Sequence, residues 1–289
     1  MRKISIIISS LLLILITFTK VNSEEKFSSW IIEFKKKAIN EGISEKTVNA
    51  VMNNAIFLPK VIEYDRYQPE FYEDTKTYVS KRTSKDKVKK GKRIYKKNKN
   101  LINIVDKEFK VEKELLLALM GIETNYGTYL GKMDIISSLA TLSYDKRRSE
   151  FFSNELITIL KLIDQNKVDK DILFGSWAGA FGNFQFMPTT ISNYAIDYNN
   201  NSIIELKEAE DSFASAANYL NKIGWRKNEP CFFNIELNEN IPRKLLNTSA
   251  KKIKHKRKFK YYKKCNKEFE NLKIDENIKV AVITPDSDI

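Results

Sequence analysis

Apolar residues recur at steps of three and four along much of this chain, and this spacing restricts the fold more than any other feature. The strongest such run, residues 101–122, predicts two helices that meet near residues 109–111. Only 9 Gly and 6 Pro occur in 289 residues, which argues against collagen-like, linker-rich or many-hairpin folds. With 42% hydrophobic residues, the chain can bury a sizeable core in one domain or two small ones. We therefore expect a mainly α fold.

Other segments extend this prediction. Ser44 follows a glycine turn and is expected to cap a helix, because its hydroxyl can accept a hydrogen bond from an unpaired amide of the next turn. Short apolar runs predict a small β accessory near the C-terminus. The predicted elements are two helices within 27–54, helices over 148–165 and 212–222, and strands over 232–237 and 278–284.

The N-terminus has the pattern of a secretory signal. Arg2 and Lys3 precede an apolar run over residues 4–18, and residues 21–23 offer a small-residue cleavage site. This run is shorter than the ~18–20 residues that cross a bilayer, so a signal peptide over 1–23 is preferred to an uncleaved anchor, which would be the chain's contact with a membrane. No Cys lies near Ser23, so lipoprotein processing is not expected. The sequence thus predicts an exported, periplasmic protein.

The chain is strongly basic. It has 50 Lys and Arg against 37 Asp and Glu, a formal charge of +13, of which +10 remains once residues 1–23 are removed. Two segments, 76–99 and 243–267, each hold twelve bases. The first is interpreted as a solvated helical face, with a dedicated anion site as the alternative. The second contains interleaved aromatics, which could indicate nucleic-acid contact, but export favours an anionic envelope polymer and argues against nucleic acid.

Cysteine and histidine usage excludes several mechanisms. His255 is the single histidine and lies in a lysine-rich segment, so Ser-His-Asp, Cys-His and multi-histidine zinc sites lack their parts. Cys231 and Cys265 are the two cysteines. They could form a disulfide in an oxidising compartment, but the sequence leaves that pairing open.

One carboxylate interrupts an apolar helix. Glu123 follows Leu116 and Leu119 at helical spacing, so it should continue their buried face. Desolvation would raise its pKa and let it act as a general acid near neutral pH. In the alternatives, Glu123 faces solvent at a helix end or pairs with Lys132 or Arg147.

Glycine, amide and aromatic groups near this acid have the character of a sugar site. They follow Glu123 directly and recur in residues 175–188, where three glycines allow close backbone approach. The alternative for 175–188 is a tightly packed turn before a helix.

Several motifs, in order and spacing, resemble the membrane-bound lytic murein transglycosylase B family from about residue 27 to the C-terminus. They are residues 65–71 (DRYQPEF), 121–127 (GIETNYG), 140–144 (ATLSY), 147–148 (RR), 176–180 (SWAGA), 182–188 (GNFQFMP), 216–220 (AANYL) and 224–225 (GW). The resemblance implies one lytic transglycosylase domain over 24–289, with a lysozyme-like helical catalytic core at about 111–228, a helical N-terminal part and the small β accessory.

The resemblance also implies an activity: cleavage of the β-1,4 bond between N-acetylmuramic acid and N-acetylglucosamine in peptidoglycan, with a 1,6-anhydromuramyl product. Glu123 matches the catalytic acid/base. No metal or cofactor is implied, and other cell-wall enzymes are candidate partners beside the glycan strands. The matching substrate-binding residues are Ser176, Gln185, Phe186 and Tyr219 for the glycan, and Arg147 and Arg148 for carboxylates of the peptide stem.

The chain departs from the family pattern in three places. A calcium loop of relatives corresponds to residues 197–203, which keep Asp197, Asn199 and Asn201 but have Ser202 in place of glycine. Thr189 replaces a common serine. The sequence ends at residue 289, before a further cleft motif of relatives, so either the C-terminal end is truncated or the protein closes its cleft differently. A non-catalytic peptidoglycan-binding relative and a lysozyme-type hydrolase therefore remain as alternatives.

Overall fold

The computed structural model describes residues 25–67, 73–230, 232–235, 241–248, 253–265 and 267–284. The chain divides into two compact units, one of residues 1–68 and 84–227, the other of residues 69–83 and 228–289. The predicted signal peptide over 1–23 lies outside the described residues. Within the described part, no helix has both the length and the apolar character needed to cross a membrane.

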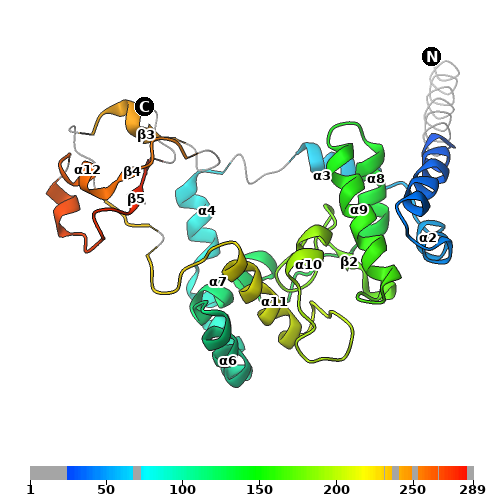
Figure 1. Ribbon diagram of the computed structural model, residues 1–289, viewed down its shortest axis with the longest axis horizontal. Coiled ribbons are helices and arrows are strands. Elements are labelled where there is room, and N and C mark those ends of the chain that lie inside the picture. Colours follow the sequence, from blue (N-terminus) through cyan, green and yellow to red (C-terminus); the bar gives the residue numbers. More distant parts are fainter. Residues whose placement is uncertain are drawn as a thin grey trace, which may run out of the picture. The chain divides into compact units, whose positions relative to one another are not determined.

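The first unit is built from helices, as the sequence predicted (Figure 1). Two of them correspond to the run 101–122, and Lys110 between them takes a left-handed conformation that ends the first. Its helices are residues 25–40, α2 (Glu45–Met52), α3 (Pro59–Arg66), α5 (Lys85–Lys97), α6 (Lys99–Phe109), α7 (Lys113–Thr124), α8 (Ile135–Tyr144), α9 (Ser149–Asp164), α10 (Pro188–Tyr194) and α11 (Ala209–Lys222).

The helices α8 and α9 pack side by side (Figure 1). Every residue of α8 from Ile135 to Ser143 is buried, so this helix has no solvent-exposed face. The spacing of apolar residues along 148–165 predicts one buried face that includes Phe151, Phe152, Leu156 and Ile159. On α9, Phe152, Leu156 and Ile159 are buried as predicted, but Phe151 is exposed, because it lies one residue away from the buried stripe.

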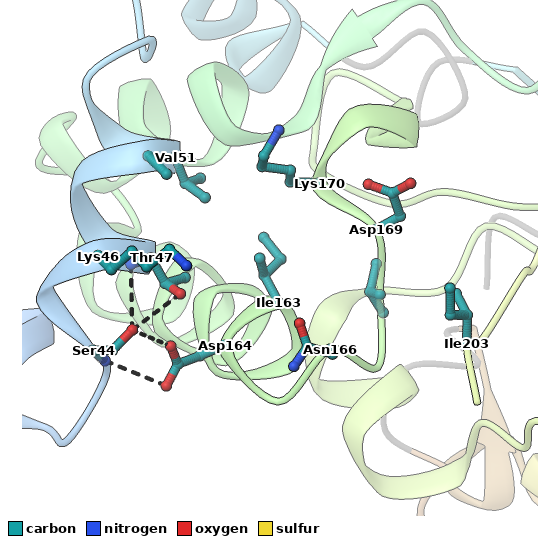
Figure 2. Close-up of a pocket in the computed structure, with 12 residues that line it drawn as sticks. Ser44, Lys46, Thr47, Val51, Ile163, Asp164, Asn166, Asp169, Lys170 and Ile203 are labelled. Carbon is teal, nitrogen blue, oxygen red and sulfur yellow. Dashed lines mark hydrogen bonds between the residues drawn. The ribbon is translucent and has the colours of Figure 1, made fainter.

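Ser44 begins α2 as predicted and also joins α2 to α9. Its hydroxyl oxygen accepts a hydrogen bond from the Thr47 amide, and the hydroxyl donates to the Asp164 carboxylate (Figure 2). The Ser44 amide donates to the same carboxylate at 3.3 Å. These hydrogen bonds, the one from the Ser44 hydroxyl foremost, lower the pKa of Asp164.

Two loops of the first unit are brought together by a short antiparallel ladder. The strands β1 (Met133–Asp134) and β2 (Phe174–Gly175) pair with Met133 opposite Gly175. A Cβ atom at Gly131 would lie 2.0 Å from the Gly175 carbonyl oxygen, so this approach requires glycine. The ladder thereby places the segment that follows Glu123 beside the predicted glycan-binding segment 175–188.

The second unit combines short strands and helices around a small core. Residues 232–235 are not strand, which corrects part of the prediction for 232–237, whereas 278–284 contains two short strands. The elements are α4 (Thr75–Arg82), the parallel pair β3 (Leu246–Asn247) and β6 (Val282–Ile283), the antiparallel pair β4 (Arg257–Lys258) and β5 (Lys279–Val280), α12 (Phe259–Lys263) and the 3-10 turns Arg243–Leu245 and Lys267–Asn271.

The aromatic residues of the basic segment 243–267 serve mainly as core. Phe259 and Tyr262 are buried and both contact Phe269 edge to face, while Tyr261 is about half exposed. Two of the three aromatics are therefore unavailable for stacking on bases. His255 is exposed, as expected. Cys231, one of the two cysteines of the possible disulfide, lies outside the described residues.

Candidate active site

Glu123 lies in the last turn of α7, one residue before the helix ends. Leu116 is buried and Leu119 partly buried on the predicted apolar face, but the Glu123 side chain itself remains exposed. The protein around its carboxyl nevertheless desolvates it and raises its pKa. The prediction of a buried side chain is thus wrong, while the predicted pKa shift is supported.

No hydrogen bond or ion pair holds the Glu123 carboxyl among the described residues. Neither Lys132 nor Arg147, the alternative partners considered from the sequence, contacts it, and Arg147 is engaged elsewhere. Segments 121–134 and 175–188 contain one other acid, Asp134, which accepts a hydrogen bond from the Ser137 amide at the start of α8. Glu123 is the unengaged carboxylate of these segments.

A left-handed turn follows Glu123. Asn125, Tyr126 and Gly127 all have positive φ, with values of 48°, 59° and 76°. The turn is fixed by Thr124, whose hydroxyl donates to the Asn183 carbonyl at 2.8 Å and accepts from the Gly127 amide at 3.0 Å. The side chain of the residue after Glu123 is therefore bonded directly to the segment 175–188.

Gln185 and Ser176 shape that segment from within. Gln185 has a positive φ of 50°, and its amide nitrogen donates to the carbonyls of Gly182 at 3.0 Å and Leu130 at 3.3 Å. The Ser176 hydroxyl accepts from the Ala180 amide at 3.0 Å. Both predicted residues thus lie in the loops joined to the Glu123 turn.

Phe186 and Tyr219 form an aromatic contact behind the same loop. Phe186 is buried, and its ring meets that of Tyr219 edge to face at 5.6 Å. Tyr219, on α11, also contacts Tyr194 at 5.1 Å. The buried position gives Phe186 a packing role, whereas Tyr219 is partly exposed. Pro188 begins α10 directly after this loop, so the segment is also the packed turn that the sequence allowed.

The two predicted stem-binding arginines share one internal carboxylate. Arg147 donates from Nε to Asp65 Oδ2 at 2.6 Å, and Arg148 donates to Asp65 Oδ1. Asp65 is buried, and although burial alone would raise its pKa, the two guanidinium groups hold that pKa below its usual value. Both arginine side chains remain 40–45% exposed. Two cations on one carboxylate leave a net positive charge at this surface.

The predicted site residues fall into two groups. Glu123 lies near the end of α7, next to a turn that is bonded to the loop of Ser176, Gln185 and Phe186, and Tyr219 contacts Phe186. Arg147 and Arg148 follow α8 and bond to α3; among the described residues, no hydrogen bond or ring contact joins them to the Glu123 loops.

A pocket of about 460 Å³ opens at another place in the first unit (Figure 2). It lies between α2 and the end of α9, and Lys46, Asp169 and Lys170 are among the residues that line it. None of the predicted site residues lines it. Its Asp164 carboxylate is already held by Ser44. This pocket is separate from the candidate site.

In the loop over 197–203, side-chain oxygens bond to amides of the loop itself. Asp197 accepts hydrogen bonds from the amides of Asn201 and Ser202. The side chains of Asn199 and Asn201 likewise accept from amides within the loop. In the described part of the chain, no group of three or more His, Cys, Asp or Glu side chains is placed to hold a metal ion.

Several residues of this region were not found from the sequence. The sequence showed Asp65 only as part of a motif and did not predict its bonds to Arg147 and Arg148, because these residues are about eighty positions away and local spacing does not reveal such contacts. Lys87 and Lys90 lay within a basic segment interpreted as solvated, yet both bond to the end of α7. This corrects the interpretation of residues 76–99 for these two lysines.

Comparisons with known proteins agree with this geometry. SltB3 from Pseudomonas aeruginosa, in complex with NAG-NAM-pentapeptide, is 30% identical, with a TM-score of 0.76 over 83% of this chain and 63% of its own. Escherichia coli Slt35 in complex with bulgecin A is 31% identical, with a TM-score of 0.63 over 69% of this chain and 65% of its own. These similarities confirm the lysozyme-like helical fold.

The sequence relatives lead to the same family. Membrane-bound lytic murein transglycosylase B of Escherichia coli strain K12 is 35% identical over 153 residues, 53% of this chain. The chain thus matches 42% of the length of that curated relative. The transglycosylase SLT domain matches residues 26–288, nearly the whole chain. The chain therefore belongs to the transglycosylase SLT domain family.

Proposed function

We propose that this protein is a lytic transglycosylase that cleaves the β-1,4 bond between N-acetylmuramic acid and N-acetylglucosamine in peptidoglycan. The observation that carries the proposal is the state of Glu123. It is an unengaged carboxylate with a raised pKa, next to the Gln185 loop, in a chain of the transglycosylase SLT domain family. Its raised pKa favours the protonated form that a general acid needs, and its exposed side chain can reach a substrate.

The reaction needs one carboxyl group. Glu123 donates its proton to the glycosidic oxygen as the bond from this oxygen to C1 of the muramyl residue breaks. The C6 hydroxyl of the same residue attacks C1, and its proton returns to Glu123. The products are a free sugar hydroxyl and a 1,6-anhydromuramyl end, and water is not consumed. Because the nucleophile belongs to the substrate, its effective concentration is high without a second carboxylate to activate water.

The other predicted residues would bind the substrate around this centre. Ser176, Gln185 and Tyr219 offer hydroxyl and amide groups to the glycan, and Phe186 supports Tyr219 from behind. Arg147 and Arg148 retain exposed guanidinium surface and a net positive charge for a stem carboxylate. The complex of SltB3 with NAG-NAM-pentapeptide supports a peptidoglycan ligand of this kind.

Export fits the same proposal. The signal pattern over 1–23 would deliver the protein to the periplasm, where peptidoglycan is present. Fusion of these residues to a reporter that is active only after export tests this part. Retention of the reporter in the cytoplasm would contradict it.

Digestion of purified murein sacculi tests the activity. We expect soluble anhydromuropeptides, identified by mass spectrometry, from the unaltered protein. Replacing Glu123→Gln removes the general acid and should lower kcat by at least ~10²-fold while sacculus binding is retained. Products with reducing ends would indicate a lysozyme-type hydrolase instead. Binding without any product would indicate a non-catalytic relative.

A further inference from the structure

The end of α7 that carries Glu123 is electrostatically unfavourable for an acid. The last turn of a helix leaves backbone carbonyls without helical partners and concentrates partial negative charge, so cations stabilise it and carboxylates do not. α7 has no basic residue in its own last turn. The positive charge comes instead from α5.

Two lysines of α5 bond to this end of α7. Lys87 donates from Nζ to the Gly121 carbonyl at 3.1 Å, and Lys90 donates from Nζ to the Asn125 carbonyl at 2.7 Å. Lys90 also donates to the Thr128 hydroxyl. Lys90 therefore joins both ends of the left-handed turn that follows Glu123.

The same face of α5 admits the aromatic ring of that turn. Gly91 lies beside Lys90 and four positions after Lys87, so the three residues share one helical face. A Cβ atom at Gly91 would lie 2.5 Å from the Tyr126 hydroxyl oxygen, and one at Gly121 would lie 2.7 Å from the Tyr126 ring. The Tyr126 ring thus lies against both glycines, and α5 meets the Glu123 turn through two ammonium groups and this ring contact.

The turn needs such support because of its backbone. Asn125 and Tyr126 are consecutive non-glycine residues in the left-handed region, a backbone conformation that persists only where surrounding contacts hold it. Without the bonds from α5, the turn would relax toward other conformations. Glu123, two residues before it, would then lose its fixed direction.

We propose that Lys87 and Lys90 are positioning residues for the cleavage reaction, which cap the helix carrying Glu123 and clamp the turn behind it. This inference rests on the proposed function. The proposal gives Lys87 and Lys90 a specific role that other lysines of the same helix do not have. Lys89 and Lys92 are exposed and make no hydrogen bond or ion pair with the described residues.

Methionine substitutions on α5 test the proposal. Lys90→Met should lower kcat on soluble peptidoglycan fragments about 10- to 100-fold with little change in KM, because a small displacement of a catalytic group costs this much. Lys87→Met should act in the same direction. Lys89→Met and Lys92→Met remove the same charge from the same helix, and their kcat should stay within about twofold of the unaltered value. Lys90→Arg, which keeps a cationic donor, should retain most activity.

Hydrogen exchange gives a readout that does not depend on activity. The amides of Tyr126, Gly127 and Tyr129 are bonded within the turn and should exchange faster in Lys90→Met than in Lys89→Met. Unchanged kcat or unchanged exchange in Lys90→Met would overturn the proposal, as would an equal loss of kcat in Lys89→Met. An unaltered protein that releases no anhydromuropeptides would instead refute the proposed function, and the role in catalysis would fall with it.

Discussion

At the scale of single residues, Glu123 links stability to chemistry. Its raised pKa means that the folded protein binds more protons than the unfolded chain at pH values between the ordinary carboxyl pKa and the raised one. The free energy of unfolding therefore falls as pH rises through this window. Above the raised pKa, where Glu123 is deprotonated in both states, the protein keeps this lower stability. A catalytic acid kept at a cost in stability is expected at an active site.

The first prediction follows from this linkage. Glu123→Gln should raise the Tm near neutral pH, because the amide avoids the cost of a partly desolvated charge. Near about pH 3, below both pKa values, the difference should vanish. Thermal unfolding of both proteins as a function of pH measures it. A Gln variant that is less stable than the unaltered protein near neutral pH would show that the carboxylate makes favourable contacts.

The pKa of Asp65 is shifted in the opposite direction to that of Glu123, so its effect on stability has the opposite dependence on pH. Its pKa lies below the usual value despite burial, so the pair with Arg147 and Arg148 adds stability above the ordinary carboxyl pKa and loses it as pH falls through the lowered one. Asp65→Asn leaves two guanidinium groups without their shared anion. We expect a loss of about 1–3 kcal/mol by urea unfolding, less than for fully buried pairs because the arginines are partly exposed.

A surface pair provides the control for Asp65. Glu33 and Lys36 lie 2.8 Å apart on an exposed helix face, with side chains 69% and 65% exposed. Glu33→Gln should change stability by less than about 0.5 kcal/mol. Equal effects of the two substitutions would mean that the buried Asp65 cluster contributes no more than a solvated pair.

At the scale of elements, the contact of α5 with α7 depends on glycine. Gly91→Ala would normally favour a helix, but its Cβ would overlap the Tyr126 hydroxyl. We expect a loss of about 1–3 kcal/mol from this overpacking, measured by urea unfolding. Removing the hydroxyl with Tyr126→Phe should recover part of that loss in the double variant. A purely stabilising Gly91→Ala would exclude the close approach.

The 197–203 loop gives a prediction about metal. Because Asp197, Asn199 and Asn201 direct their oxygens to amides of the loop itself, the loop should not require a cation. Neither calcium addition nor treatment with a chelator should then shift the Tm. A calcium-dependent increase in Tm would show that the loop rearranges to bind the ion.

The sequence predicted several of the helices that have one apolar and one polar face, but it missed the short helix α3, which lies in a stretch between two prolines that shows no clear period. Helices α2, α7, α9 and α11 repeat apolar residues on one side, and each was found close to its observed bounds. The helix α8 was not predicted as an element, because it is buried on all sides and therefore lacks amphipathic periodicity. The two-residue strands gave no usable pattern, since alternation needs a longer run. Contacts such as Lys90 with Asn125 depend on how helices pack and cannot be read from spacing.

At the scale of the whole molecule, the residues that give the protein its net positive charge are different from the residue proposed to carry out the reaction. The formal charge of +13 comes from many exposed lysines, while the candidate reaction depends on one acid. Exposed charges act over the Debye length and mainly change how often the protein meets an anionic polymer. Bond cleavage at Glu123 occurs after binding and should not depend on those distant charges.

This separation predicts two different responses to salt. Binding to sacculi should weaken steadily between about 50 mM and about 500 mM NaCl, whereas kcat on short soluble fragments should change little over the same range. Replacing exposed residues of α5 together, Lys89→Gln, Lys92→Gln and Lys96→Gln, should weaken sacculus binding and reduce its salt dependence while kcat is retained. Co-sedimentation and fragment turnover measure the two quantities. If the triple variant bound as tightly as the unaltered protein, the charge of this helix face would have no part in recognising the cell wall, and recognition would rest on the glycan-binding loops alone.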